Sequence, residues 1–180
     1  LVIGTWWESP FGRFTDVMIE RADGHRVLVA PTAQVRDFVA ETYTFDETRI
    51  EPIDLQRNDS RWLLCADSLS LSLTIGGRRP LGWALRGIPR PLATSTAWAS
   101  AVDPIARVVL RGVRTRGVAR PGRREWYAST DLRAITSASG RLDGEPLGDL
   151  RPVDPPCHFG FSSTPRAPGV TTVVTTVEST

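Results

Sequence analysis

Residues 68–75 alternate strictly between polar and apolar side chains. Leu69, Leu71, Leu73 and Ile75 occupy every second position, and serine or threonine fills the positions between them. Successive side chains point to opposite faces in a strand, so one face of this segment is apolar and the other is lightly polar. The apolar face has to be covered, and we expect the rest of the chain to supply neighbouring strands and a covering layer.

The segment 14–42 carries clear local signals for a hairpin followed by a helix. Apolar alternation on both sides of residues 22–24 predicts a hairpin over 14–30 with both strands half-buried, and Gly24 allows the positive φ that such a turn requires. Thr32 is a typical N-cap, and Val35, Phe38, Val39 and Thr42 then follow at helical spacing. The sequence therefore predicts an amphipathic helix over 32–42 that packs against a sheet.

Strand patterns continue along most of the remaining chain, whereas residues 1–13 show no periodicity and predict irregular structure. The glycine pair 76–77 predicts the end of the 68–75 strand. Further strands are expected at 46–57, 61–66, 113–119, 124–129, 132–142, 158–162 and 170–177. We predict one domain spanning residues 1–180 with an α+β, β-rich fold. In it, a mainly antiparallel sheet of about eight or nine strands forms a barrel or half-barrel with two or three covering helices.

The segment 78–112 differs in character from its surroundings. Its apolar residues recur at positions 81, 85, 88 and 92 and again at 98, 102, 105 and 109, and arginines punctuate the first group. Asp103 and Pro104 resemble the N-cap and first residue of a helix that ends at Gly112. The pattern predicts two short helices with a kinked connector. They form a basic, apolar cover for the sheet, with a lid over a cavity or a membrane-surface patch as the functional alternatives.

Positive charge is concentrated in the middle of the chain. All 22 basic residues are arginines, and residues 78–124 hold eleven of them against a single acid, Asp103. The local formal charge is therefore +10, and the rest of the chain carries −8. Such a segment either pairs with the acidic flanks or presents a surface to anions. The absence of lysine excludes a lysine Schiff base, a pyridoxal anchor and a phosphate-loop lysine.

Few residues suggest catalysis. The weak catalytic candidates are His158, Glu125 and Glu20, because a histidine titrates near neutrality and a carboxylate facing apolar side chains can serve as a base. Cys157 and His158 are adjacent, and neighbours on a strand make a poor dyad. No Gly-x-Gly-x-x-Gly motif and no metal-ligand spacing is present, so neither a cofactor nor a metal is expected. Cys65 and Cys157 are expected to be buried free thiols.

Two resemblances can be stated. The stretches 20–31, Glu-Arg-Ala-Asp-Gly-His-Arg-Val-Leu-Val-Ala-Pro, and 159–166, Phe-Gly-Phe-Ser-Ser-Thr-Pro-Arg, resemble a family of uncharacterised bacterial proteins, which implies no particular activity. The order of strands is remotely similar to that of the acetoacetate-decarboxylase-like barrels. The decarboxylases of that group use a reactive lysine, which this chain lacks. The resemblance therefore does not imply that this chain catalyses their reaction.

The leading hypothesis is a barrel-like domain that binds a small, mostly apolar molecule, with or without an anionic group. The expected ligand-binding residues are Trp83, Trp98, Trp126, Arg114 and Arg116. The alternatives are an enzyme of unknown reaction on the same scaffold, or a module that touches an anionic membrane surface or a protein partner. Nucleic acid is less favoured, although Arg111, Arg120, Arg123 and Arg124 also lie close in sequence to Trp126 and Tyr127. The default location is cytoplasmic, with a signal peptide removed before Leu1 as the open alternative.

Overall fold

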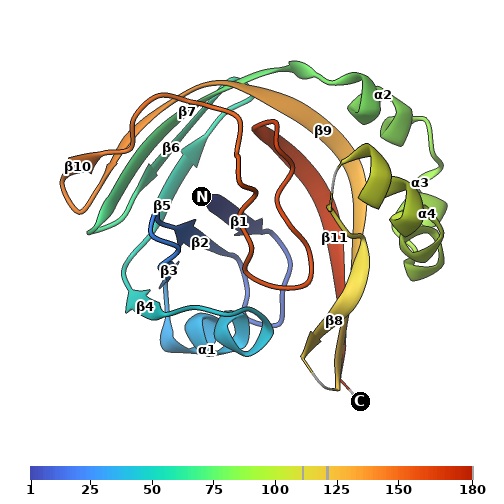
Figure 1. Ribbon diagram of the computed structural model, residues 1–180, viewed down its shortest axis with the longest axis horizontal. Helices are drawn as coiled ribbons and strands as arrows, with labels where there is room; N and C mark the ends of the chain where they lie inside the picture. The colour runs from blue at the N-terminus through green and yellow to red at the C-terminus, as the bar shows by residue number, and fades with distance from the viewer. Residues whose placement is uncertain (111, 121, 180) are drawn as a thin grey trace. The chain divides into compact units, whose positions relative to one another are not determined.

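The chain divides into two compact units, and two of the three points where it passes from one to the other lie within strands. A computed structural model describes residues 1–110, 112–120 and 122–179, shown in Figure 1. Unit 1 comprises residues 1–73 and 138–149, and unit 2 comprises residues 74–137 and 150–180. The two units differ sharply in charge. Unit 1 holds eight arginines and fifteen acidic residues, a formal charge of −7, whereas unit 2 holds fourteen arginines and five acidic residues, a formal charge of +9.

A four-stranded sheet forms the first part of unit 1. Its strands are β1 (Val2–Trp6), β2 (Phe14–Glu20), β3 (Arg26–Ala30) and β4 (Glu47–Ile50), hydrogen-bonded in that order. The predicted hairpin is confirmed as β2 and β3, and Gly24 in its turn has φ +86°. Residues 1–13 are not wholly irregular as expected, because β1 pairs along β2 and places Trp6 against Phe14. Both hairpin strands are more deeply buried than predicted, since Val27 to Ala30 are all buried.

Helix α1 (Ala33–Thr42) covers one face of this sheet, as the sequence predicted. Thr32 is its N-cap, and the Thr32 hydroxyl accepts a hydrogen bond from the Val35 amide at 3.3 Å. Val35 and Val39 pack with Phe14, Leu28 and Ala30 of the sheet. Because α1 connects β3 to β4, these two strands run parallel, unlike the antiparallel pairs β1–β2 and β2–β3 of the same sheet.

The remaining strands belong to a second sheet. They are β5 (Asp54–Arg57), β6 (Arg61–Cys65), β7 (Leu69–Arg78), β8 (Arg116–Arg120), β9 (Arg123–Leu142), β10 (Glu145–Pro146) and β11 (Gly169–Ser179). Its main path is β10-β9-β7-β6-β5, and β8 and β11 each pair with β9. The described residues thus hold eleven strands in two mainly antiparallel sheets, and no closed barrel is found among them.

The alternation at residues 68–75 predicted β7 correctly, but not its end. Leu69, Leu71, Leu73 and Ile75 are all buried. The strand continues through Gly76 and Gly77 to Arg78 instead of stopping at the glycines. A Cβ on Gly76 would come within 2.6 Å of the Thr136 side chain, so this glycine permits close packing with β9 rather than a turn. The segments 124–129 and 132–142, expected as two strands, form the single strand β9.

Three helices follow β7 in the basic segment, which brings the total in the described chain to four rather than two or three. They are α2 (Pro80–Arg86), α3 (Arg90–Ala93) and α4 (Thr96–Val109), and Figure 1 shows them following one another along unit 2. The expected helix start at Asp103 is wrong. Helix α4 begins after Ser95, whose hydroxyl accepts the Trp98 amide at 3.1 Å, and Pro104 lies inside the helix. Residues 158–162 form no strand, only a single bridge between His158 and Ser163.

Unit 1 also buries a carboxyl group beside the indole ring of Trp6. Asp16 lies opposite Gly4 in the β1–β2 ladder, and the Trp6 indole Nε1 donates a hydrogen bond to Asp16 Oδ1 at 2.8 Å. Burial raises the pKa of Asp16 from its ordinary value of 3.8 to about 7, against the opposing effect of the Trp6 hydrogen bond. The neutral acid is therefore the form that suits the folded protein, and ionisation at higher pH costs stability.

Replacing this carboxyl group with an amide should remove a pH-dependent loss of stability. The wild-type folded state has the higher pKa, so its contribution is complete below about pH 4 and is lost as the pH rises through about 7. Asp16→Asn keeps an acceptor for Trp6 and does not ionise. Urea unfolding at pH 4 and pH 8 should show that the variant gains about 3–4 kcal/mol relative to wild type between these pH values. An identical pH dependence in both proteins would contradict the assignment.

Candidate anion-binding site

Strand β8 and the start of β9 form a basic hairpin in unit 2. Arg116 lies directly opposite Trp126, and Val118 lies opposite Arg124. Directly opposed residues of an antiparallel pair share a face, as do alternate residues along each strand. These four side chains therefore belong to one face, and Gly117, Glu125 and Tyr127 belong to the other.

Helix α4 holds the beginning of this hairpin through the carboxylate of Asp103. Asp103 Oδ1 accepts hydrogen bonds from the Thr115 amide at 2.9 Å and from the Arg116 amide at 3.3 Å, while Oδ2 pairs with Arg107 at 2.8 Å. The carboxylate is buried, and desolvation acts to raise its pKa. The two amides and the nearby guanidinium groups of Arg107 and Arg114 outweigh that effect, so the pKa of Asp103 lies below its ordinary value.

Two further hydrogen bonds join α4 to the hairpin. The Thr115 hydroxyl donates to the carbonyl oxygen of Ala99 at 2.6 Å, and the Trp126 indole Nε1 donates to the Ser100 hydroxyl at 3.1 Å. Because Ala99 and Asp103 are one helical turn apart, a single buried face of α4 fixes the hairpin. The indole of Trp126 is thereby held in one orientation.

The loop 158–163 packs against the opposite face of the hairpin. The Ser162 hydroxyl accepts a hydrogen bond from the Arg114 amide at 2.9 Å. Phe161 stacks on Tyr127 with ring centroids 5.3 Å apart and planes inclined by 11°. A Cβ on Gly117 would overlap the Phe161 ring, so glycine at this position makes room for the phenyl group.

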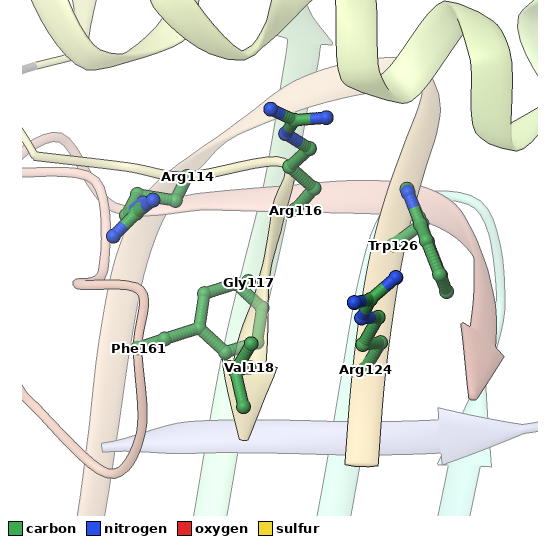
Figure 2. Close-up of a pocket in the computed structure, with 7 residues that line it drawn as sticks. All are labelled: Arg114, Arg116, Gly117, Val118, Arg124, Trp126 and Phe161. Carbon is green, nitrogen blue, oxygen red and sulfur yellow. The ribbon is translucent and has the colours of Figure 1, made fainter. Parts of the chain in front are cut away.

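These elements line an open hollow of about 540 Å³, to which both faces of the hairpin contribute. Figure 2 shows the side chains that line it: Arg114, Arg116, Gly117, Val118, Arg124, Trp126 and Phe161. The lining residues that the structure describes combine three guanidinium groups with two aromatic rings and include no carboxylate. Within the described residues, none of the three arginines takes part in an ion pair. The Nε of Arg114 is buried without a hydrogen-bond partner there.

A second hollow in unit 2 provides a useful contrast. It measures about 390 Å³ and includes Arg79, Arg151 and Arg166 in its lining. Arg79 donates to the carbonyl oxygen of Pro168 at 3.1 Å, and Arg166 pairs with Asp154 at 2.6 Å. Two of these three arginines are thus already engaged, whereas those of the larger pocket lack acidic partners among the described residues.

The structure brings three of the five expected ligand-binding residues together. Arg114, Arg116 and Trp126 line the larger pocket. Trp83 does not: it is 62% exposed on α2, with the Arg78 guanidinium 4.6 Å from its ring centre. Trp98 lies on α4, half-buried and outside the lining.

Sequence reasoning missed four lining residues of the pocket: Gly117, Val118, Arg124 and Phe161. Arg124 is two positions before Trp126, so alternation along the strand placed it on the same face and was a usable signal. Phe161 reaches the pocket from a distant loop, and no local pattern indicated this. Arg111 and the side chain of Arg120, which the sequence grouped with these arginines, lie outside the described residues.

The catalytic candidates do not join this pocket. Glu125 is buried on the other face of β9, where the Tyr127 hydroxyl donates to its Oε2 at 2.8 Å. His158 is exposed while the adjacent Cys157 is buried, and Glu20 belongs to unit 1. Neither cysteine forms a disulfide, but Cys65 is exposed rather than buried as expected, because β6 turns that side chain outward. In the described part of the chain, no cluster of three or more metal-ligating side chains occurs.

Comparisons with protein-family models, with curated proteins and with solved structures find no match. The two resemblances noted in the sequence therefore stay predictions. None of the described helices combines the length and apolar character needed to cross a bilayer.

Removing the Asp103 carboxylate should destabilise the hairpin. Asp103→Ala leaves the Thr115 and Arg116 amides without their acceptor and leaves Arg107 without its partner, which we expect to cost about 3 kcal/mol. Asp103→Asn retains one acceptor oxygen and should cost less. Urea unfolding of the three proteins at neutral pH measures both differences. Equal stability of wild type and Asp103→Ala would show that α4 does not hold the hairpin in this way.

Proposed function

We propose that this protein binds a small organic anion with a flat or extended apolar body in the pocket lined by Arg114, Arg116, Arg124, Trp126 and Phe161. The observation that carries the proposal is one hollow lined by three arginines that form no ion pair within the described residues, with Trp126 contributed from one face of the hairpin and Phe161 from the other. The ligand class is a carboxylate or phosphate attached to an aromatic or aliphatic group.

The anionic part of the proposal is supported by the arginines. A guanidinium group presents planar donors that match a carboxylate or phosphate, and such charge-assisted hydrogen bonds are stronger than neutral ones. Unit 2 has a formal charge of +9, and two of its five acids, Asp103 and Glu125, are buried. An anion entering this pocket therefore meets little local competition from carboxylates of the same unit.

The apolar part is supported by the rings and by the size of the hollow. Trp126 and Phe161 offer surface to an apolar body, and about 540 Å³ falls within the range of small-molecule sites. The proposal retains the ligand expected from the sequence but places it at the hairpin instead of inside a barrel. The segment 81–110 then acts through α4, which supports the hairpin, rather than as a lid.

Binding is proposed rather than catalysis. The seven lining residues described here include no carboxylate, histidine, cysteine or hydroxyl group that serves as an acid, base or nucleophile. The proposed function therefore needs only recognition of charge and apolar surface.

Calorimetric titration with matched probes tests the ligand class. Naphthoate, decanoate and phenyl phosphate should bind, and naphthamide, the neutral counterpart of naphthoate, should bind at least ten-fold more weakly. The reason is that a hydrogen bond to a charged group contributes about 1.5–3 kcal/mol. Raising the salt concentration should weaken binding of the anions. Equal affinity for naphthoate and naphthamide, or no binding of any probe at millimolar concentration, would refute the proposal.

Paired arginine substitutions locate the site. Arg116→Gln with Arg124→Gln should weaken naphthoate binding at least ten-fold without changing the unfolding free energy, because both side chains are exposed and outside every described ion pair. Arg61→Gln with Arg141→Gln removes the same charge from exposed positions outside the pocket and should leave binding within two-fold of wild type. Equal weakening by both pairs would indicate a general charge effect instead of a site.

A further inference from the structure

Helix α4 has an unusual outer surface. Its exposed residues are Ala97, Ala101, Pro104, Ile105, Arg107, Val108 and Val109. Six of these seven are apolar, and Ile105, Val108 and Val109 are 63%, 79% and 63% exposed. A helix that packs on a protein by one face normally turns charged and polar residues to water on the other. The outer surface of α4 does not follow this rule.

This outer surface is distinct from the face that packs on the hairpin. Ala99 and Asp103 are the buried residues of α4, and the hydrogen bonds to Thr115 and Trp126 come from that side. The sequence predicted a single apolar stripe through positions 98, 102, 105 and 109. The contacts of Asp103 rotate the helix so that Ile105 and Val109 point outward.

Exposed positive charge accompanies the apolar surface. Arg86 on α2 and Arg90 on α3 are exposed, and so is Arg107 of α4, which pairs with Asp103 at 2.8 Å. Asp131 approaches Arg86 only to 3.9 Å and is engaged by Arg78 at 2.7 Å. Asp103 is the sole acid in the sequence from Arg78 to Leu110, and it is buried. The exposed charges of the three helices are therefore all positive.

We propose that the outer surface of α4, with Arg86 and Arg90, docks on the surface of an anionic lipid bilayer. Ile105, Val108 and Val109 enter the boundary between headgroups and acyl chains, and the arginines meet lipid phosphates. This is the arrangement of an amphipathic helix that lies in the membrane interface. The exposed Trp83 and Leu92 supply further apolar contact from α2 and α3.

Charge complementarity favours a bilayer over a second copy of the chain. A symmetric dimer formed through this surface would bring the arginines of one copy close to those of the other, with no exposed acid on the three helices to compensate. An anionic bilayer offers a layer of negative charge above an apolar interior. Both layers match what α4 and its neighbours present.

Vesicle sedimentation tests the proposal with the full chain and no other ligand. We expect binding to vesicles of phosphatidylcholine with 30% phosphatidylglycerol to be at least ten-fold tighter than to pure phosphatidylcholine, and to weaken when salt is raised from 50 to 500 mM. Absence of binding to the anionic vesicles at low salt, or equal binding to both, overturns the proposal. Phosphatidylglycerol belongs to the ligand class proposed for the pocket, so the pocket variant Arg116→Gln with Arg124→Gln is measured in the same assay. This variant should bind anionic vesicles within two-fold of wild type, and loss of its binding would place the lipid at the pocket and overturn the proposal for α4.

Matched variants identify the surface that binds. Ile105→Ser, Val108→Ser and Val109→Ser together should reduce binding to anionic vesicles at least ten-fold. Val173→Ser with Val174→Ser, which changes valines 42% exposed on β11, should leave binding unchanged. Arg86→Gln with Arg90→Gln should weaken binding and lower its salt dependence, whereas Arg61→Gln with Arg141→Gln should not.

Two results would contradict specific docking of α4 on a bilayer. Equal loss of binding in the β11 and α4 variants would show that apolar exposure in general, rather than α4, drives adsorption. A wild-type dimer in light scattering that becomes a monomer in the α4 variant would show that a second copy covers this surface. Circular dichroism and urea unfolding of each variant establish that the folded protein is being compared.

Discussion

The carboxylate of Asp103 is the contact on which the basic half of this protein depends. It is the single acid among eleven arginines between residues 78 and 124, yet it is buried and accepts hydrogen bonds from two backbone amides of the hairpin. Of the arginines in that segment it forms an ion pair only with Arg107 within the described residues. The arginines of the pocket therefore keep their charge exposed to any anion that enters, because the nearby acid is committed to holding the backbone.

The sequence predicted correctly those strands, turns and helix starts whose conformation is set by residues close together in the chain. The alternation around Leu71, the N-cap at Thr32 and the turn at Gly24 each indicate one conformation by themselves, and all three are confirmed. The errors occur where distant contacts decide. Trp6 belongs to a strand because it packs on Phe14, and Gly76 continues a strand because Thr136 lies close to it. Neither neighbour is visible in the local pattern.

The residues of the candidate site that lie close together in the sequence were predictable, and those brought in from distant segments were not. Arg116 and Trp126 lie on neighbouring strands joined by a short turn, so alternation and proximity in sequence were enough to group them. Phe161 enters from a loop that fits over Gly117, and only the folded structure reveals this contact. The sequence predicted Asp103 to be a helix N-cap, because aspartate before proline is typical of a helix start. Its actual role depends on amides that follow it in the chain by twelve and thirteen positions.

Both proposals depend on how Asp103 places α4 and the hairpin. The pocket arginines form no ion pair within the described residues, and Ile105, Val108 and Val109 of α4 are turned outward. The most direct test of that account is amide hydrogen exchange at Thr115 and Arg116, compared between the wild-type protein and Asp103→Ala. The account predicts that both amides are protected in the wild type and lose protection in the variant, while the capped Val35 amide of α1 is unchanged. Rapid exchange of Thr115 and Arg116 in the wild-type protein would contradict it.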